Sequence, residues 1–427
     1  MLNLRYKWIG SNQLNILIVS QYFWPEPFII NDLVLKIKAQ GHNVTIFTGK
    51  PNYPDGKVYP GYKSTGVQEE LYDDGIEIYR IPLRPRHFGG GKNLVLNYLS
   101  FVFSGLRHAF SFSKKRRFDS ILVFCPSPIT ASIPAILIKW LTKAHLAIWV
   151  QDLWPESLQA TGFIRNRFVL ACVRNLVRGI YYFSDTLLVQ SRAFIKPVSQ
   201  LAPNKDIIYY PNSAIDSFDK PVSLNSLPEN LAHLLDTQFC MVFAGNIGTA
   251  QAVETIVEAA IKLKDMPELK LILVGSGTKS SWVEERILES ELPNLVLAGR
   301  FPPAEMPQIL SKASGLLVTL KRDEIFSCTI PSKIQTYLAA GKPIIAALDG
   351  EGAKVITEAG AGLASPAEDA EKLANNIKNL YHMSSLERDE FGKAGRLYFL
   401  EHFEMDSQGR FLTQILEAEI VKRGVCK

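Results

Sequence analysis

The sequence predicts an α/β protein made of two successive doubly wound halves, and three observations lead to this prediction. Apolar runs of strand length alternate with helix-length patterns along the whole chain, as in parallel sheets covered by helices on both faces. The alternation stops at 210–238 and then starts again. The length of 427 residues leaves room for two domains of ordinary size.

The predicted strands of the first half are short apolar runs. They lie at 16–20, 44–48, 121–124, 146–150 and 186–190. Helical patterns separate most of them, and Gly41 follows the pattern at 30–40, where a helix-ending glycine belongs. Residues 1–14 are polar and lack the apolar core of a signal peptide. We therefore predict an N-terminal extension at 1–14 and a first Rossmann-like domain at 15–210.

The second half repeats the pattern after a connector that contains Pro211 and Asn212. Its predicted strands lie at 239–244, 270–274, 295–298, 315–319 and 343–347. We predict a second Rossmann-like domain at 211–385. The helical patterns after it suggest a closing segment at 386–427, which we expect to pack back on the first domain.

Composition narrows the function classes. The net charge of +5 is a mild excess and lacks the strong basic stripe of a nucleic-acid-binding protein, so we expect no nucleic acid partner. The apolar run 94–106 is followed by the basic tetrad 114–117. This 94–117 segment fits a helix lying on an anionic membrane surface, or a core helix that ends in a solvated charge run. Five scattered cysteines without metal-ligand spacing suggest reduced thiols in a cytoplasmic protein.

Unusual loops follow three strands of the first half, at 21–27, 125–128 and 151–157. Trp24 and Glu26 come after the first strand, and Asp152 and Trp154 come after the strand at 146–150. Prolines, aromatic rings and isolated carboxylates at strand ends suit a stiff pocket in which a sugar stacks on an aromatic face. The alternative is that the tryptophans only fill the edge of the domain. We predict that Asp152 or Glu26 is catalytic and orients a hydroxyl group of the ligand or stabilises positive charge at a reacting carbon.

Glycine-rich loops follow two strands of the second half. The first contains Gly245, Asn246 and Gly248, and the second contains Gly275 and Gly277. Small residues before a helix let a phosphate approach backbone N–H groups. Neither loop matches the GxxxxGK[ST] pattern, which argues against a P-loop nucleotidase. The pair predicts a nucleotide-type ligand.

The segment 320–343 adds a cation to this site. Ser332 belongs to a predicted helix start, and Lys333 lies in the first turn, where a cation opposes the helix dipole. A cation placed there needs an anion to offset it, so a diphosphate is a natural partner. The alternative is a lysine that faces solvent.

Four segments carry a resemblance to a known family. They are 20–26 (SQYFWPE), 152–157 (DLWPES), 243–248 (FAGNIG) and 330–343, which contains IPSK and YLAAGKP. With them the chain resembles the family 4 glycosyltransferases of the GT-B fold, over nearly all of the sequence after residue 14. Within the family it resembles bacterial fucosyl- and N-acetylfucosaminyl-type transferases of O-antigen, capsule and exopolysaccharide assembly. The resemblance implies two Rossmann-like domains that face a central cleft, with the acceptor side at 15–210 and the nucleotide-sugar-binding side at 211–385.

The resemblance also implies the chemistry. The donor would be a UDP- or GDP-linked sugar, and the acceptor a saccharide linked to undecaprenyl diphosphate. Transfer would retain the anomeric configuration and need neither a metal nor another cofactor. The protein would be cytoplasmic and peripheral at the inner face of the membrane.

Some family residues are replaced in this sequence. Many members hold the diphosphate with Arg and Lys at the positions of Asn246 and Gln251, and many have two Glu at the positions of Cys328 and Thr336, the second of which binds the ribose. Other cations would then have to offset the diphosphate charge. The candidates, all after strands of the second half, are Arg300, Lys321 and Lys333.

Two other functions fit the same architecture. A sugar-nucleotide 2-epimerase would convert the nucleotide sugar without an acceptor. A non-catalytic subunit would bind the nucleotide sugar without turnover, and the replaced family residues are compatible with this second alternative.

Overall fold

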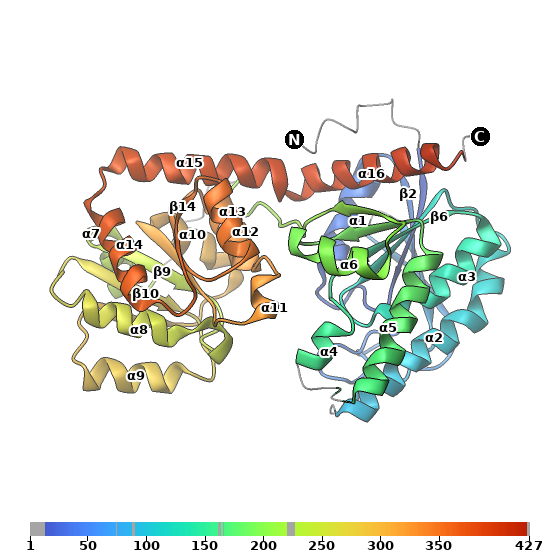
Figure 1. The fold of residues 1–427 in the computed structure, drawn as a ribbon, viewed down its shortest axis with the longest axis horizontal. Coiled ribbons are helices and arrows are strands. Elements are labelled where there is room, and N and C mark those ends of the chain that lie inside the picture. The colour runs from blue at the N-terminus through green and yellow to red at the C-terminus, as the bar shows by residue number, and fades with distance from the viewer. Residues whose placement is uncertain are drawn as a thin grey trace. The chain divides into compact units, whose positions relative to one another are not determined.

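The computed structural model describes residues 13–73, 75–87, 90–160, 164, 166–219 and 227–424, and the chain forms two compact units (Figure 1). The first unit takes the chain up to Asn212 and again from Met405, and the second unit is Ser213–Glu404. The chain therefore passes between the units twice. Most of the predicted N-terminal extension, residues 1–12, lies outside the described residues.

The first unit is built on one eight-stranded sheet with the order β3-β4-β2-β1-β5-β6-β7-β8. All of its strand pairs are parallel except β3–β4. The strands are β1 Asn15–Ser20, β2 Asn43–Gly49, β3 Gln68–Tyr72, β4 Ile76–Ile81, β5 Ser120–Cys125, β6 His145–Val150, β7 Thr186–Val189 and β8 Asp206–Tyr209. The five strands predicted in this half are confirmed, whereas β3, β4 and β8 were not predicted.

Helices cover both faces of this sheet. Helix α1 (Ile29–Ala39) packs beside α16 (Met405–Lys422) on one face, while α2 (Gly91–Ser113), α3 (Ser132–Thr142) and α5 (Arg167–Phe183) cover the other (Figure 1). The short helices are α4 Glu156–Ala160 and α6 Ile195–Leu201. Leu33 and Ile37 of α1 share one apolar core with Leu412 and Leu416 of α16.

The second unit has a six-stranded, fully parallel sheet with the order β11-β10-β9-β12-β13-β14. The strands are β9 Phe239–Ala244, β10 Leu269–Val274, β11 Leu295–Gly299, β12 Gly315–Thr319, β13 Ile344–Ala347 and β14 Gly362–Ser365. The helices are α7 Glu229–Thr237, α8 Val253–Lys262, α9 Ser280–Glu289, α10 Met306–Lys312, α11 Glu324–Ser327, α12 Ser332–Ala340, α13 Glu351–Glu358, α14 Ala370–His382 and α15 Ser385–His402. Separate apolar clusters on its two faces confirm a second doubly wound sheet.

The closing helical segment differs from its prediction. It does not pack on the first domain as one piece, because α15 belongs to the second unit and only α16 belongs to the first. A Cβ atom on Gly392 of α15 would lie 2.1 Å from the carbonyl oxygen of Gly341, at the end of α12. Arg396 of α15 donates to the Ala339 carbonyl at 3.1 Å and forms an ion pair with Asp216. These contacts hold α15 on the second unit, so the boundary lies at Glu404.

Both sheets have a point at which the strand order reverses. In the first unit it lies between β1 and β5, and in the second between β9 and β12. Open parallel sheets bind ligands at the carboxyl ends of the strands that flank such a point. The loops after these four strands are therefore where sites are expected.

Candidate functional site

The two glycine loops of the second unit are in direct contact. Gly245 follows β9 with φ +136° and Gly275 follows β10 with φ +142°, a backbone region that favours glycine. A Cβ atom on Gly275 would lie 1.8 Å from the Gly245 carbonyl oxygen, and one on Gly277 would lie 2.3 Å from that of Ile247. The predicted pair of loops therefore forms one tightly packed backbone surface at the carboxyl edge of the sheet.

Lys333 reaches this surface from the first turn of α12. A Cβ atom on Gly245 would lie 2.6 Å from Lys333 Cε, and Lys333 Nζ lies 3.7 Å from the centroid of the Phe243 ring. The Nζ atom is buried and has no hydrogen-bond partner among the described residues. Burial lowers the pKa of Lys333 from 10.5 to about 7. A buried ammonium group without partners is unfavourable unless an anion satisfies it.

Tyr337 holds α12 in this position. Its hydroxyl oxygen accepts the Ala244 backbone N–H at 2.8 Å, at the very end of β9. The spacing of four residues places Tyr337 and Lys333 on the same face of the helix. Sequence reasoning missed Tyr337 and Phe243, although this spacing was a signal that could have found Tyr337. Ser332, the first residue of α12, is exposed beside Lys333.

The residues that replace the family's cations contact each other. The Asn246 side-chain amide donates to Gln251 Oε1 at 3.3 Å. A Cβ atom on Gly248 would lie 2.6 Å from Asn246 Nδ2. A neutral amide pair therefore occupies the first glycine loop, which leaves Lys333 as the cation nearest to Gly245.

The structure places the two other candidate cations differently. The Lys321 N–H donates to the Ala250 carbonyl at 3.0 Å, which brings Lys321 beside the first glycine loop. Arg300 is exposed after the edge strand β11. The preceding residue, Gly299, accepts from the Gly275 N–H at 2.7 Å, so Arg300 lies by the second glycine loop.

The family's ribose carboxylate has no substitute at its own position. Thr336 is exposed on α12, and its hydroxyl donates to the Ser332 carbonyl at 3.3 Å. Cys328 is a free, half-buried thiol after α11. Any ribose recognition must therefore come from other groups.

In the first unit, Glu26 fastens two loops together. One carboxylate oxygen accepts from the backbone N–H groups of Asn52 at 2.8 Å and Tyr53 at 2.7 Å, and the other accepts from that of Phe23 at 3.1 Å. Glu26 is only 1% exposed, and burial raises its pKa to about 7. With both oxygens engaged, Glu26 supports the loops rather than reaching a substrate, and this geometry argues against its predicted catalytic role.

Replacing Glu26 with alanine should destabilise the protein by about 3 kcal/mol, because three buried N–H groups lose their acceptor. Glu26→Gln keeps one oxygen and should fold with turnover within a few-fold of wild type.

The pKa of Glu26 is raised above 4.5 in the folded state, so between about pH 4.5 and 7 the folded protein binds a proton that the unfolded chain does not. The free energy of unfolding therefore falls as the pH rises through this window. Urea unfolding at pH 5 and 8 should show a smaller fall in the free energy of unfolding for Glu26→Gln than for wild type. A large loss of turnover in this variant at unchanged stability would restore the catalytic role.

Asp152 and Trp154 follow β6, the neighbour of β5 in the sheet. The Trp154 Nε1–H donates to Asp152 Oδ2 at 3.2 Å. Burial raises the pKa of Asp152, and hydrogen bonds from Ser157, Trp154 and Leu153 oppose that rise. Asp152 remains partly accessible, whereas Trp154 is buried at 8% exposure. Trp154 therefore positions Asp152 and is not an open stacking platform.

Trp24 is the more open of the two predicted tryptophans, with 38% of its surface exposed. Its ring contacts Tyr72 of β3 at a centroid distance of 5.4 Å, and its carbonyl accepts from Arg80. A contact with a sugar ring at Trp24 stays a prediction.

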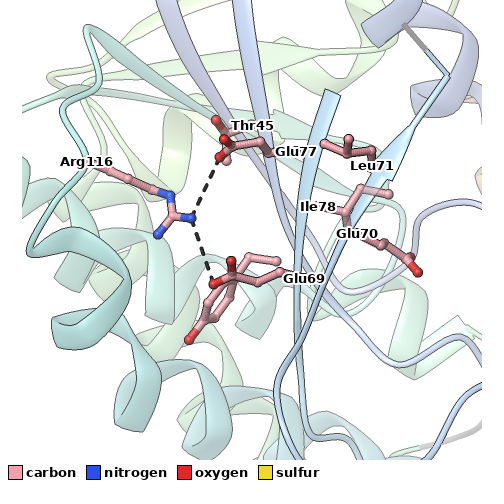
Figure 2. Close-up of a pocket in the computed structure, with 8 residues that line it drawn as sticks. Thr45, Glu69, Glu70, Leu71, Glu77, Ile78 and Arg116 are labelled. Carbon is pink, nitrogen blue, oxygen red and sulfur yellow. Dashed lines mark ion pairs between the residues drawn. The ribbon is translucent and has the colours of Figure 1, made fainter. Parts of the chain in front are cut away.

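A cavity of about 220 Å³ lies at the β3–β4 edge of the first unit, away from the predicted loops. Figure 2 shows Arg116 extending toward Glu69 and Glu77, with Nη2 to oxygen distances of 3.9 and 3.7 Å. The guanidinium also lies 4.8 Å from the Phe112 ring centroid. Arg116 is thus engaged within its own unit and is not a free member of the basic tetrad 114–117.

Neither a metal-ligand group nor a membrane-spanning helix is found among the described residues. Within the described ranges, no group of three or more His, Cys, Asp and Glu side chains is arranged to hold a metal ion. Among the same residues, no helix combines the length and apolarity needed to cross a membrane. The four described cysteines are free thiols, and Cys426 lies outside the described residues.

Comparison with known families explains why both sheets carry such loops. Residues 29–212 match the model of the glycosyl transferase 4-like domain, and residues 238–383 match that of the glycosyl transferases group 1. The chain belongs to the family 4 glycosyltransferases. The two matched regions fall within the two doubly wound units, so the predicted family and enzyme class are confirmed.

Two relatives of this family 4 glycosyltransferase are of similar length. WbjE of Pseudomonas aeruginosa, named as a glycosyltransferase, is 25% identical over 296 residues, which cover 68% of this chain and 73% of WbjE. WcaI of Escherichia coli K12, named as a colanic acid biosynthesis glycosyl transferase, is 25% identical over 318 residues, 73% of this chain and 76% of WcaI.

Solved structures confirm the GT-B fold of this family 4 glycosyltransferase. Sucrose-phosphate synthase from Thermosynechococcus elongatus superposes with a TM-score of 0.68 at 16% identity, covering 96% of this chain and all of that one. HepE of Anabaena, solved in complex with UDP, gives a TM-score of 0.63 at 14% identity over 95% of this chain and all of HepE. At these identities the likeness establishes the fold alone.

Proposed function

We propose that this glycosyltransferase moves a sugar from a UDP- or GDP-linked donor to a lipid-linked saccharide during the synthesis of a cell-surface polysaccharide. The observation that carries the donor assignment is the buried, unpartnered Nζ of Lys333 beside Gly245. A diphosphate would supply the missing acceptors. HepE, a structural neighbour, has been solved with UDP, which supports a nucleoside diphosphate ligand.

Retention of configuration is proposed because the resemblance to the family implies it. The bond between the anomeric carbon and the diphosphate oxygen breaks, the acceptor oxygen attacks from the same face, and its proton passes to the departing phosphate oxygen. Lys333 would stabilise the charge that develops on the leaving group. Asp152 would orient the acceptor hydroxyl or stabilise the positive charge at the anomeric carbon. No metal or other cofactor is required in this scheme.

The proposed pathway rests on the relatives. WcaI is named for colanic acid biosynthesis, which supports an exopolysaccharide, capsule or O-antigen role. Fucosyl or N-acetylfucosaminyl transfer is the proposed specificity, and undecaprenyl diphosphate the proposed carrier of the acceptor.

Peripheral attachment to the inner face of the membrane, on the cytoplasmic side, is part of the proposal. On α2 of the 94–117 segment, Phe103 and Phe110 are 68% and 62% exposed, close to the exposed Lys114 and Lys115. On α5, which covers the same face of the sheet, Phe168 is 77% exposed. Exposed aromatic side chains beside cations favour an anionic lipid surface.

A panel of nucleotide sugars tests the donor assignment. We expect one UDP- or GDP-linked sugar to raise the melting temperature by several degrees, since a ligand that binds only the folded state stabilises it by mass action. The same donor should be turned over with a polyprenyl-diphosphate-linked saccharide in the presence of excess EDTA. Stabilisation by no nucleotide would contradict the donor site, and loss of turnover in EDTA would contradict the metal-free scheme.

A further inference from the structure

Arg86 lies in an aromatic cage at the carboxyl edge of the first unit's sheet. It follows β4, and its Cζ atom lies 5.0 Å from the Tyr22 ring centroid, 5.3 Å from that of Tyr53 and 5.8 Å from that of Tyr98. Contacts with three rings hold a planar guanidinium in one orientation. The cage members come from loops after β1 and β2 and from α2, so distant parts of the chain converge on this one cation.

The hydrogen bonds of Arg86 are incomplete. Its Nη2 donates to the Tyr22 hydroxyl, and its backbone N–H donates to Asn52 Oδ1 at 3.2 Å. Its Nε is buried and has no partner, and among the described residues Arg86 forms no ion pair with a carboxylate. Glu26 is close enough for its charge to act on Tyr22, but its oxygens accept from backbone N–H groups. The positive charge of Arg86 is therefore not neutralised.

A second unsatisfied atom lies in the same network. Gln21 Nε2 donates to the Tyr22 hydroxyl at 3.2 Å and to Asn97 Oδ1 at 2.7 Å, while Gln21 Oε1 is buried without a partner. The cage thus lacks an acceptor for Arg86 and a donor for Gln21. A ligand with anionic oxygens and hydroxyl groups offers both.

Tyr98 connects this cage to the proposed catalytic carboxylate. Its hydroxyl interacts with Tyr22 and Ser127, and the charge of Asp152 acts on it. Ser127 follows β5 and Asp152 follows β6, so the arrangement runs along the carboxyl edge across the strand-order reversal. An anion at Arg86 would bind on the Asp152 side of the first unit.

We propose that Arg86 binds a phosphoryl group of the acceptor, which places the acceptor hydroxyl near Asp152. This inference rests on the proposed function, since it concerns the acceptor of that reaction. Arginine suits the role because its fork of N–H groups matches phosphate oxygens. The phosphoryl group belongs either to a prenyl diphosphate carrier or to a soluble sugar phosphate.

Two probes separate these sources. Farnesyl diphosphate and glucose 1-phosphate are titrated separately into the full chain by calorimetry, with UDP and GDP both in excess to occupy the nucleotide site. We expect wild type to bind at least one probe, and Arg86→Gln to bind it at least ten-fold more weakly. Arg84→Gln is the matched control, because the Arg84 side chain is exposed on the same loop, and its affinity should equal that of wild type.

The outcomes are decisive for Arg86. If Arg86→Gln does not fold, Arg86→Lys replaces it, and at least a three-fold loss of affinity is expected because the fork is lost. Unchanged affinity in the folded Arg86 variant, an equal loss in Arg84→Gln, or no binding of either probe by wild type would overturn the proposal. UDP and GDP are titrated alone before either probe is added, and this titration reports on the nucleotide site separately. Absence of nucleotide binding there would contradict the proposed donor and not the role of Arg86.

Discussion

Replacing Lys333 with methionine should lower kcat/KM for the nucleotide sugar by about 10²- to 10³-fold and, at the same time, make the protein more stable near neutral pH. The loss of activity follows from removing the buried cation that would pair with the diphosphate, an interaction worth about 2–4 kcal/mol in a water-excluded site. Steady-state kinetics with varied donor measure it.

The gain in stability has a defined pH dependence. The pKa of Lys333 falls from 10.5 in the unfolded chain to about 7 in the folded protein, because the group is buried. Between these values the unfolded chain binds the proton and the folded protein does not, so wild-type stability rises with pH across this window. The destabilisation caused by burying the charged lysine is fully present below about pH 7 and corresponds to roughly 5 kcal/mol at most. Urea unfolding of Lys333→Met should show the largest gain at pH 6.5 and almost none at pH 10.5.

Lys342 provides the matched control for Lys333. It follows the other end of α12, and burial also lowers its pKa. Because it lies away from the glycine loops, Lys342→Met should leave the donor kinetics unchanged. Unchanged kinetics in Lys333→Met would remove Lys333 from the donor site. A loss of stability in this variant at pH 6.5 would show that the buried charge of Lys333 does not destabilise the folded protein.

Replacing Asp152 with asparagine should reduce kcat by at least 10²-fold while nucleotide affinity stays within about two-fold of wild type. Asparagine has nearly the same shape and can still accept from Trp154, but it cannot carry the negative charge that would stabilise the reacting carbon. The proposed nucleotide site lies in the second unit and Asp152 in the first. Single-turnover kinetics and calorimetric titration of the nucleotide measure the two quantities.

Glu156→Gln is the control for Asp152, because Glu156 is an exposed carboxylate at the start of α4, four residues after Asp152, with a 3.7 Å ion pair to Arg174. It should retain full turnover. Burial raises the pKa of Asp152. As the solution is made acidic, wild-type kcat should therefore begin to decline at a higher pH than it would if Asp152 had the ordinary pKa of an aspartate. Parallel loss of kcat and nucleotide affinity in Asp152→Asn would indicate a structural role instead.

The sequence was informative wherever a strand is buried on both faces. The strands that flank the reversals, such as β1 and β9, are almost fully apolar, and their positions were predicted to within about a residue. The edge strand β3 is half exposed and reads QEELY, a polar pattern without an apolar face. Its place depends on pairing with β4, which the local sequence does not encode.

Side-chain roles were harder to predict than loop positions. The structure places the glycine loops after β9 and β10 and Lys333 in the first turn of α12, as the sequence predicts, because backbone demands and helix starts leave local signals. The burial of Lys333 against Phe243 depends on strand β9, 90 residues earlier in the chain. Glu26 looked like a free carboxylate at a strand end, but its backbone donors Asn52 and Tyr53 come from another loop. Arg86 was overlooked for the same reason, since its three rings are scattered over the sequence.

The return of the chain to the first unit after Glu404 limits how the protein can be dissected. Leu412, Ile415 and Leu416 of α16 are fully buried in the core of that unit. A fragment that stops at Asn212 would leave the apolar face of α1 in water and should aggregate. Expressing the acceptor half by itself therefore requires grafting the last helix onto residue 212 through a short flexible tether, whereas residues 213–404 can be cut out as one continuous piece.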